Sequence, residues 1–265
     1  MIDPAPALFG LLVGFLVGLT GVGGGSLMTP FLVAVIGVPA PTAIGTDMVY
    51  ATVTKLAGSV QHYRQRSVNL EVALFLGIGS IPASLLGVRT LEWIKGAFDA
   101  QAVRDIMTTI IAATLVLVGV SLIFKAFLPD KWTSVRKTVW DGETKMSLRR
   151  RLFTIFFGAT GGYLVGFTSI GSGSVMAVIL LLLYPLAPAV IVGTDIAHAT
   201  VLSLVTGLAH ISQGNVNFGL TGTLLLGSIP GVLIGSRIAP WVPVRPLVVV
   251  LAVMLIFVGA RSLLS

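Results

Sequence analysis

The sequence has no cysteine and few charged residues for its length. None of the 265 residues is cysteine, which excludes disulfides, thiolate metal sites and cysteine nucleophiles. Only 10% of the residues are charged whereas 55% are apolar, and several apolar runs approach twenty residues in length. A soluble core cannot bury that much apolar surface. The composition therefore predicts a polytopic membrane protein.

The apolar runs also lack the alternating pattern of barrel strands. Because backbone polar groups must be hydrogen-bonded inside a bilayer, helices are then the only reasonable spanning element. We therefore predict an all-α polytopic membrane protein. The net charge of +7 does not indicate nucleic-acid binding, since the basic residues lie in short connections and one loop, as insertion into a membrane requires.

The chain reads as two copies of one unit. A glycine-rich stretch from Gly18 to Met28 returns as Gly166 to Met176, at a constant offset of about 148 positions. Other segments recur at the same offset, among them Gly45-Thr46-Asp47 with Gly193-Thr194-Asp195, and Gly79 to Pro82 with Gly227 to Pro230. We predict a first transmembrane repeat at residues 1–128, a basic cytoplasmic linker at 129–151 and a second transmembrane repeat at 152–265.

The first apolar run, from about Pro6 to Gly37, is interrupted by Gly21 to Gly25. As one helix it would be about 45 Å long, and as two full spans it would be too short. Glycine lowers helix propensity and accepts conformations that other residues resist, so we predict a hairpin of two half-helices before three transmembrane helices in each repeat. A hairpin that returns to its own side makes the repeats inverted, which we expect, and one that crosses makes them parallel. An amphipathic connection is expected from Arg89 to Arg104.

The glycine breaks are the predicted substrate site. A helix that begins after a break presents unpaired backbone amides and the positive end of its dipole, so it can hold an anion. Two such helices meeting from opposite faces would form one site between the repeats. The alternative is that the glycines only let helices pack closely. The predicted substrate-binding residues are Gly23, Gly24, Gly25, Ser26, Gly171, Ser172, Gly173, Ser174, Thr46, Thr194 and Lys55.

Charged residues in the second apolar segment of each repeat are costly. Asp47 and Asp195 each carry an insertion penalty of about a few kcal/mol near the bilayer centre. They either cap a helix that starts after Pro41 and Gly193, or they have a functional role, in which they bind and release a proton or orient the glycine loop. His198 lies on the same helical face as Asp195 and forms a candidate proton relay with it, with a packed, hydrogen-bonded histidine as the alternative. The candidate proton-coupling residues are Asp47, Asp195 and His198.

Lys55 is matched by Ser203 in the second copy, so the site would be asymmetric in charge. A lysine at this depth should pair with Asp195 or with the anion, unless it reaches the membrane surface. The turns between spans carry Asn69 and its counterpart Asn217, for which we predict turn and cap chemistry, with a gate as the alternative.

These features resemble the sulfite exporter TauE/SafE family of membrane transporters. The resemblance covers nearly the whole chain and rests on the glycine break of each copy, Gly45 to Asp47, Gly193 to Asp195, the basic linker and the repeat. It implies a bacterial or archaeal inner-membrane carrier of sulfite, sulfoacetate or other organosulfonates. The second copy departs from a pure glycine run by carrying Ser172 and Ser174, and the resemblance assigns no role to Lys55.

The sequence predicts a secondary transporter rather than an enzyme, with alternating access coupled to protons. Two other functions stay open: an anion channel lined by the same donors, and an intramembrane hydrolase that uses Ser172 or Ser174 with His198 or His210. Flux that saturates at low substrate and depends on a second gradient separates a carrier from a channel. A serine-reactive probe tests the hydrolase.

The expected partners are a small anionic substrate and membrane lipid, without nucleic acid, cofactor or metal, and a homodimer is left open. The expected location is the cell inner membrane, with the central basic loop in the cytoplasm.

Overall fold

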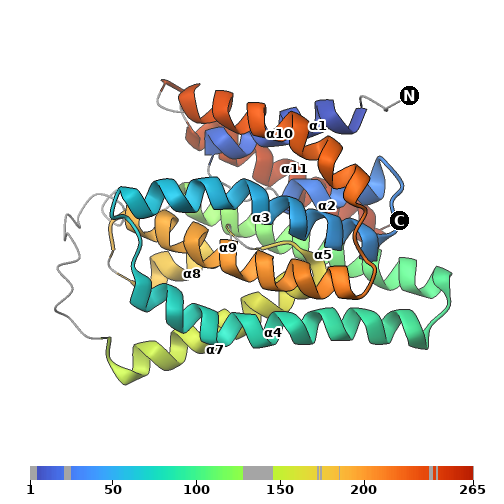
Figure 1. Ribbon diagram of the computed structural model, residues 1–265, viewed down its shortest axis with the longest axis horizontal. Helices are drawn as coiled ribbons and strands as arrows, with labels where there is room; N and C mark the ends of the chain where they lie inside the picture. The colour runs from blue at the N-terminus through green and yellow to red at the C-terminus, as the bar shows by residue number, and fades with distance from the viewer. Residues whose placement is uncertain are drawn as a thin grey trace.

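The computed structural model describes residues 5–20, 25–127, 146–171, 173, 175–184, 186–238, 241–242 and 244–264. These residues form helices and no strand (Figure 1). The helices are α1 (Ala5–Thr20), α2 (Gly25–Ala34), α3 (Ala40–Arg64), α4 (Leu70–Ala97), α5 (Ala100–Phe127), α7 (Leu148–Thr168), α8 (Val175–Leu183), α9 (Pro188–Ser212), α10 (Phe218–Ile238) and α11 (Val244–Leu264).

Five described helices are long and apolar enough to cross a membrane. They are segments of α4, α5, α9, α10 and α11, while α1 and α2 are shorter apolar helices. This confirms the predicted all-α transmembrane fold class. The predicted connection from Arg89 to Arg104 is wrong, because α4 continues to Ala97 and α5 begins at Ala100. Most of the predicted linker lies outside the described residues, and its last positions, 148–151, belong to α7.

The first two helices lie against each other and run in opposite directions. The rings of Phe9 and Phe31 stack, and Val13 shares a buried cluster with Met28 and Leu32. Residues near the start of α1 therefore meet residues near the end of α2. The chain reverses direction between the two helices, as the predicted hairpin of half-helices requires.

The second copy has the same arrangement in α7 and α8. The side chain of Met176, at the start of α8, lies against Gly161 in the second half of α7. Tyr184, just after α8, is hydrogen-bonded to the hydroxyl of Thr154 and donates to the sulfur of Met146 at 3.0 Å, just before α7. The start of α7 and the end of α8 thus lie at the same end of the bundle.

Each hairpin packs along a long helix of the other repeat. Figure 1 shows α1 beside α10 at one edge and α7 beside α4 at the opposite edge. Glycine permits the approach: a Cβ at Gly227 would overlap the carbonyl oxygen of Ala7, and one at Gly79 would overlap that of Ile155. The two contacts involve equivalent positions of the two repeats, because Gly79 corresponds to Gly227 and Ala7 to Ile155. Each repeat therefore packs against the other through the same kind of contact. The glycines of these long helices therefore allow the helices to pack closely.

Corresponding helices of the two repeats run in opposite directions. In the central pair α3 and α9, Gly58 lies near Ile196, whereas Gly207 lies near Met48. In the pair α5 and α11, contacts of Gly119 with Ala252 and of Gly259 with Ala112 show the same reversal. These directions support the expected inverted repeats.

Candidate functional site

Described residues of the two glycine breaks are in contact in the buried interior of the bundle. Gly25 is the first residue of α2, and Ser169 follows the last residue of α7. A Cβ built on Gly25 would lie 2.6 Å from the carbonyl oxygen of Ser169 and 3.1 Å from Oδ2 of Asp47. The start of α2 therefore rests directly against the second break, with the carboxylate of α3 beside both.

Asp47 connects the two breaks through one carboxylate oxygen. Its Oδ2 accepts a hydrogen bond from Oγ1 of Thr29 at 2.8 Å and another from the hydroxyl of Ser169. All three side chains are fully buried. Since Thr29 lies on α2 and Ser169 at the end of α7, Asp47 ties the first hairpin to the second.

The capping interpretation of the two aspartates is wrong. Helix α3 begins at Ala40 and α9 at Pro188, so both Asp47 and Asp195 lie about two turns inside their helices. Proline is tolerated in a first helical turn, which is why Pro41 does not delay the start of α3. A carboxylate in a helix interior has no free amide of its own helix to cap.

The two predicted threonines hold turns of the opposite repeat. Oγ1 of Thr46 accepts from the backbone amide of Asn217 at 3.1 Å, and Oγ1 of Thr194 accepts from that of Asn69 at 2.9 Å. The asparagines cap the helices that follow, through hydrogen bonds from Val72 and Leu220 to their side-chain oxygens. This confirms the predicted cap chemistry and places both threonines between the repeats.

Lys55 lies on α3, half-buried, where its charge interacts with Asp195 of α9 and with Asp47. The side chain of Asp195 is buried, and its charge also interacts with Lys125 on α5. The expected partner of Lys55, a carboxylate of the other repeat, is therefore nearby. The two aspartates differ in surroundings, since Asp47 has two hydroxyl donors and Asp195 faces two lysine charges.

His198 is buried, and its Nε2 is hydrogen-bonded to Oγ of Ser80 on α4 at 2.7 Å. Its Nδ1 and the Oδ1 of Asp195 have no hydrogen-bond partner among the described residues. The structure thus shows the packed, hydrogen-bonded histidine rather than a direct bond between these two atoms.

Several predicted residues lie outside the part of the chain that the structure describes: Gly23, Gly24, Ser172 and Ser174. Of the others, Ser26 is buried at the start of α2. Gly171 and Gly173 have φ angles of 109° and 144°, which side chains other than glycine rarely adopt. No cluster of potential metal ligands occurs among the described residues.

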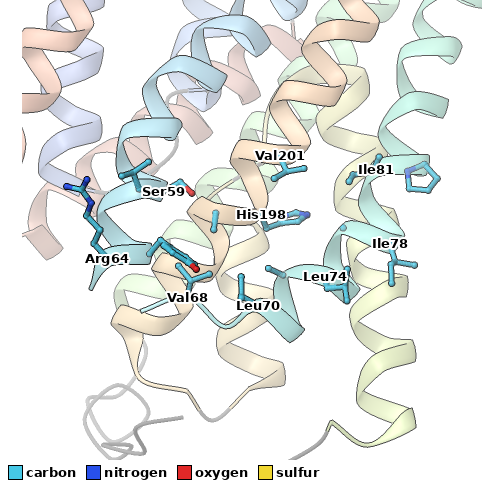
Figure 2. A pocket seen from close by; sticks show the side chains of 15 residues that line it. Ser59, Arg64, Val68, Leu70, Leu74, Ile78, Ile81, His198 and Val201 are labelled. Carbon is cyan, nitrogen blue, oxygen red and sulfur yellow. The ribbon is translucent and has the colours of Figure 1, made fainter. Parts of the chain in front are cut away.

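A cavity of about 1060 Å³ lies between α3, α4 and α9, away from the glycine breaks. Figure 2 shows His198 at its centre, with Leu74 and Ile78 from α4 on one side and Ser59 from α3 on the other. Its walls are mainly apolar, and of the predicted site residues only His198 lines it. The cavity is therefore suited to apolar chains rather than to a small anion.

Sequence reasoning missed Ser169 and Thr29. The signal was present for Ser169, because the first copy has Gly21 at the equivalent position, so a hydroxyl distinguishes the second break from the first. Thr29 gave a similar signal, because the second copy has Ala177 at the equivalent position, but a threonine in an apolar helix commonly bonds to its own backbone.

The chain is similar to known proteins along almost its whole length. It matches the family described as Sulfite exporter TauE/SafE over residues 7–262. It is 41% identical over 254 residues to the probable membrane transporter protein YjnA of Bacillus subtilis (strain 168), which covers 96% of this chain and 97% of that protein. It is also similar to the probable membrane transporter protein YdhB of the same organism, with 23% identity over 232 residues and 88% of each chain covered. A probable membrane transporter protein of Methanocaldococcus jannaschii is 25% identical over 255 residues, with 89% of this chain and 88% of that protein covered.

No solved structure matches the chain. The family match spans far more than half of the sequence, and the repeat, the two hairpins and the buried aspartates all fall within it. The chain therefore belongs to the sulfite exporter TauE/SafE family.

Proposed function

We propose that the protein is a secondary transporter of small sulfur-containing oxyanions, such as sulfite, sulfoacetate or other organosulfonates, and that the anion binds between the two glycine breaks. The observation that carries this proposal is the contact of Gly25 with Ser169 beside Asp47. It brings the start of α2 against the second break. The family match and the transporter names of the relatives support the substrate class and the transport role.

The chemistry of the junction suits an anion. Helices α2 and α8 both begin at a glycine-rich break, and the first amides of a helix have no partner within it. Lys55 adds a positive charge on α3, near both aspartates. Helix starts and one lysine together can replace the water that a sulfonate loses on leaving solution.

An anion bound near the carboxylates of Asp47 and Asp195 would couple its transport to the uptake of a proton. A negative substrate is repelled by ionised Asp47 and Asp195 in a medium of low dielectric, and the repulsion ends when a carboxylate takes up a proton. Proton and anion would then bind together. His198, with one ring nitrogen unpartnered among the described residues, is the third candidate in this exchange.

We further propose alternating access by rocking of one repeat against the other. Corresponding helices run in opposite directions, as inverted repeats do, and both hairpins point to one junction. The central basic loop would lie in the cytoplasm and the protein in the inner membrane. A membrane-impermeant maleimide, applied to whole cells and to inverted vesicles, tests the side of a single cysteine introduced into the loop.

The cavity of Figure 2 would be filled by lipid chains, because three of the side chains that line it, Leu70, Leu74 and Ile78, are exposed on the surface of the helix bundle. Its apolar wall and its separation from the junction argue against a role as the anion site. A hydrolase is disfavoured by the transporter names of the relatives.

Reconstitution into proteoliposomes tests the proposed function. Uptake of sulfite, sulfoacetate and other sulfonates is measured under an imposed pH gradient, with protein-free liposomes as the control. We expect saturable uptake that requires the gradient. Flux that does not saturate would favour the channel, and no movement of any anion in the panel would overturn the proposal.

A further inference from the structure

We propose that Ser169 is a positioning residue of the anion site. Ser169 and Thr29 both donate hydrogen bonds to Asp47, and Asp47 thereby links the two glycine breaks. We call these three residues the clamp. This inference rests on the proposed function, because its effect is on the geometry of that site. Ser169 does not need to touch the anion. It acts through Asp47 and through the first hairpin.

The contacts of Ser169 cross from the second repeat to the first in two places. Its hydroxyl donates to Oδ2 of Asp47, and its carbonyl oxygen lies where a Cβ on Gly25 would be 2.6 Å away. The backbone of Ser169 has a φ of 64° where α7 ends, so the end of the helix itself sets the direction of the hydroxyl. Ser169 is completely buried, as are Asp47 and Thr29, so water does not compete for these bonds.

The chain contains its own comparison for this clamp. Asp195 is the equivalent of Asp47, but the positions equivalent to Thr29 and Ser169 are Ala177 and Gly21, which have no hydroxyl. The second aspartate therefore lacks both donors of the first. If the hydroxyls served packing alone, there would be no reason for both to occur around the same carboxylate oxygen.

A clamped Asp47 fixes the start of α2 against the second break. The start of α2 is then already in place before the anion arrives, so binding does not have to order it. Without the clamp the hydrogen bonds from Thr29 and Ser169 to Asp47 no longer link the two hairpins, and a small error in the distance between the hairpins weakens each hydrogen bond to the substrate.

The variant Ser169→Gly removes the hydroxyl while retaining the backbone, because glycine readily adopts the left-handed conformation. The variant also gives the second break the residue that the first break has at the equivalent position, Gly21. We expect the dissociation constant for sulfite or sulfoacetate to rise about tenfold, because one hydrogen bond to a charged group changes an equilibrium constant by about that factor. We also expect KM to change more than kcat. Thr29→Ala, which copies Ala177, should act in the same direction. Ser236→Ala is the matched control, since the exposed hydroxyl of Ser236 donates to the carbonyl oxygen of Leu233 in its own helix.

A double-mutant cycle separates positioning from general loosening. In Asp47→Ala the acceptor is gone, so Ser169→Gly should add nothing further, whereas in Asp47→Asn an acceptor oxygen remains and the effect of Ser169→Gly should persist. Unchanged anion affinity in Ser169→Gly, or full additivity with Asp47→Ala, would overturn the clamp while leaving the proposed function in place. A wild-type protein that binds none of the anions would overturn both.

Discussion

Replacing Gly25 by leucine is expected to reduce anion transport to background. The position has no room for a side chain, because a Cβ there would already lie 2.6 Å from the carbonyl oxygen of Ser169 and 3.1 Å from Oδ2 of Asp47. The carbonyl belongs to backbone at the end of a helix, so it cannot move aside as a flexible side chain could. Leucine would therefore push the first hairpin away from the second.

Initial rates in proteoliposomes measure this effect, with size-exclusion profiles to show that the variant is folded. The control is Gly96→Leu at the end of α4, where nothing lies within 4 Å of a built Cβ. The control should transport normally. Wild-type rates in Gly25→Leu would show that contact between the breaks is not needed.

Removing the charge of Lys55 is expected to weaken anion binding by about ten- to a hundredfold, because a hydrogen bond to a charged group contributes about 1.5–3 kcal/mol. Lys55 is half-buried, and its charge interacts with both aspartates. In the second repeat Ser203 occupies the equivalent position, so that repeat supplies no matching lysine. Lys55→Arg should retain most of the affinity.

The rise in melting temperature with anion concentration gives the affinity of each variant, since a ligand that binds the native state stabilises it by mass action. The control is Lys95→Ala, whose ammonium group is paired with Glu92 and Asn215 at the end of α4. If Lys55→Ala responds to anions as wild type does, Lys55 has no part in binding.

The sequence predicted the features that depend on local chemistry. The glycine breaks required hairpins, and Asn69 and Asn217 are caps as expected. It could not predict which helices pair across the repeats. Hydrophobic periodicity identifies a buried face but not its partner, and the pairing of α1 with α10 depends on contacts such as Gly227 with Ala7.

The candidate site was predicted in part, for a similar reason. Asp47 was recognised as costly, but its partners Thr29 and Ser169 come from two other helices and have ordinary identities. The cap that was one of two alternatives for Asp47 is wrong, because a proline in the first turn does not mark where a helix starts. His198 was paired with Asp195 from their spacing on one helix, whereas its observed partner, Ser80, lies on α4.

The central claim is that one anion contacts both glycine breaks. Because the chain has no cysteine, single variants Ser26→Cys and Ser172→Cys each report one break when labelled with a neutral maleimide. We predict that sulfite or sulfoacetate protects both positions with the same half-saturating concentration, while a cysteine at the exposed Ser212 is not protected. Protection of only one break, or of each at a different concentration, would contradict a shared site.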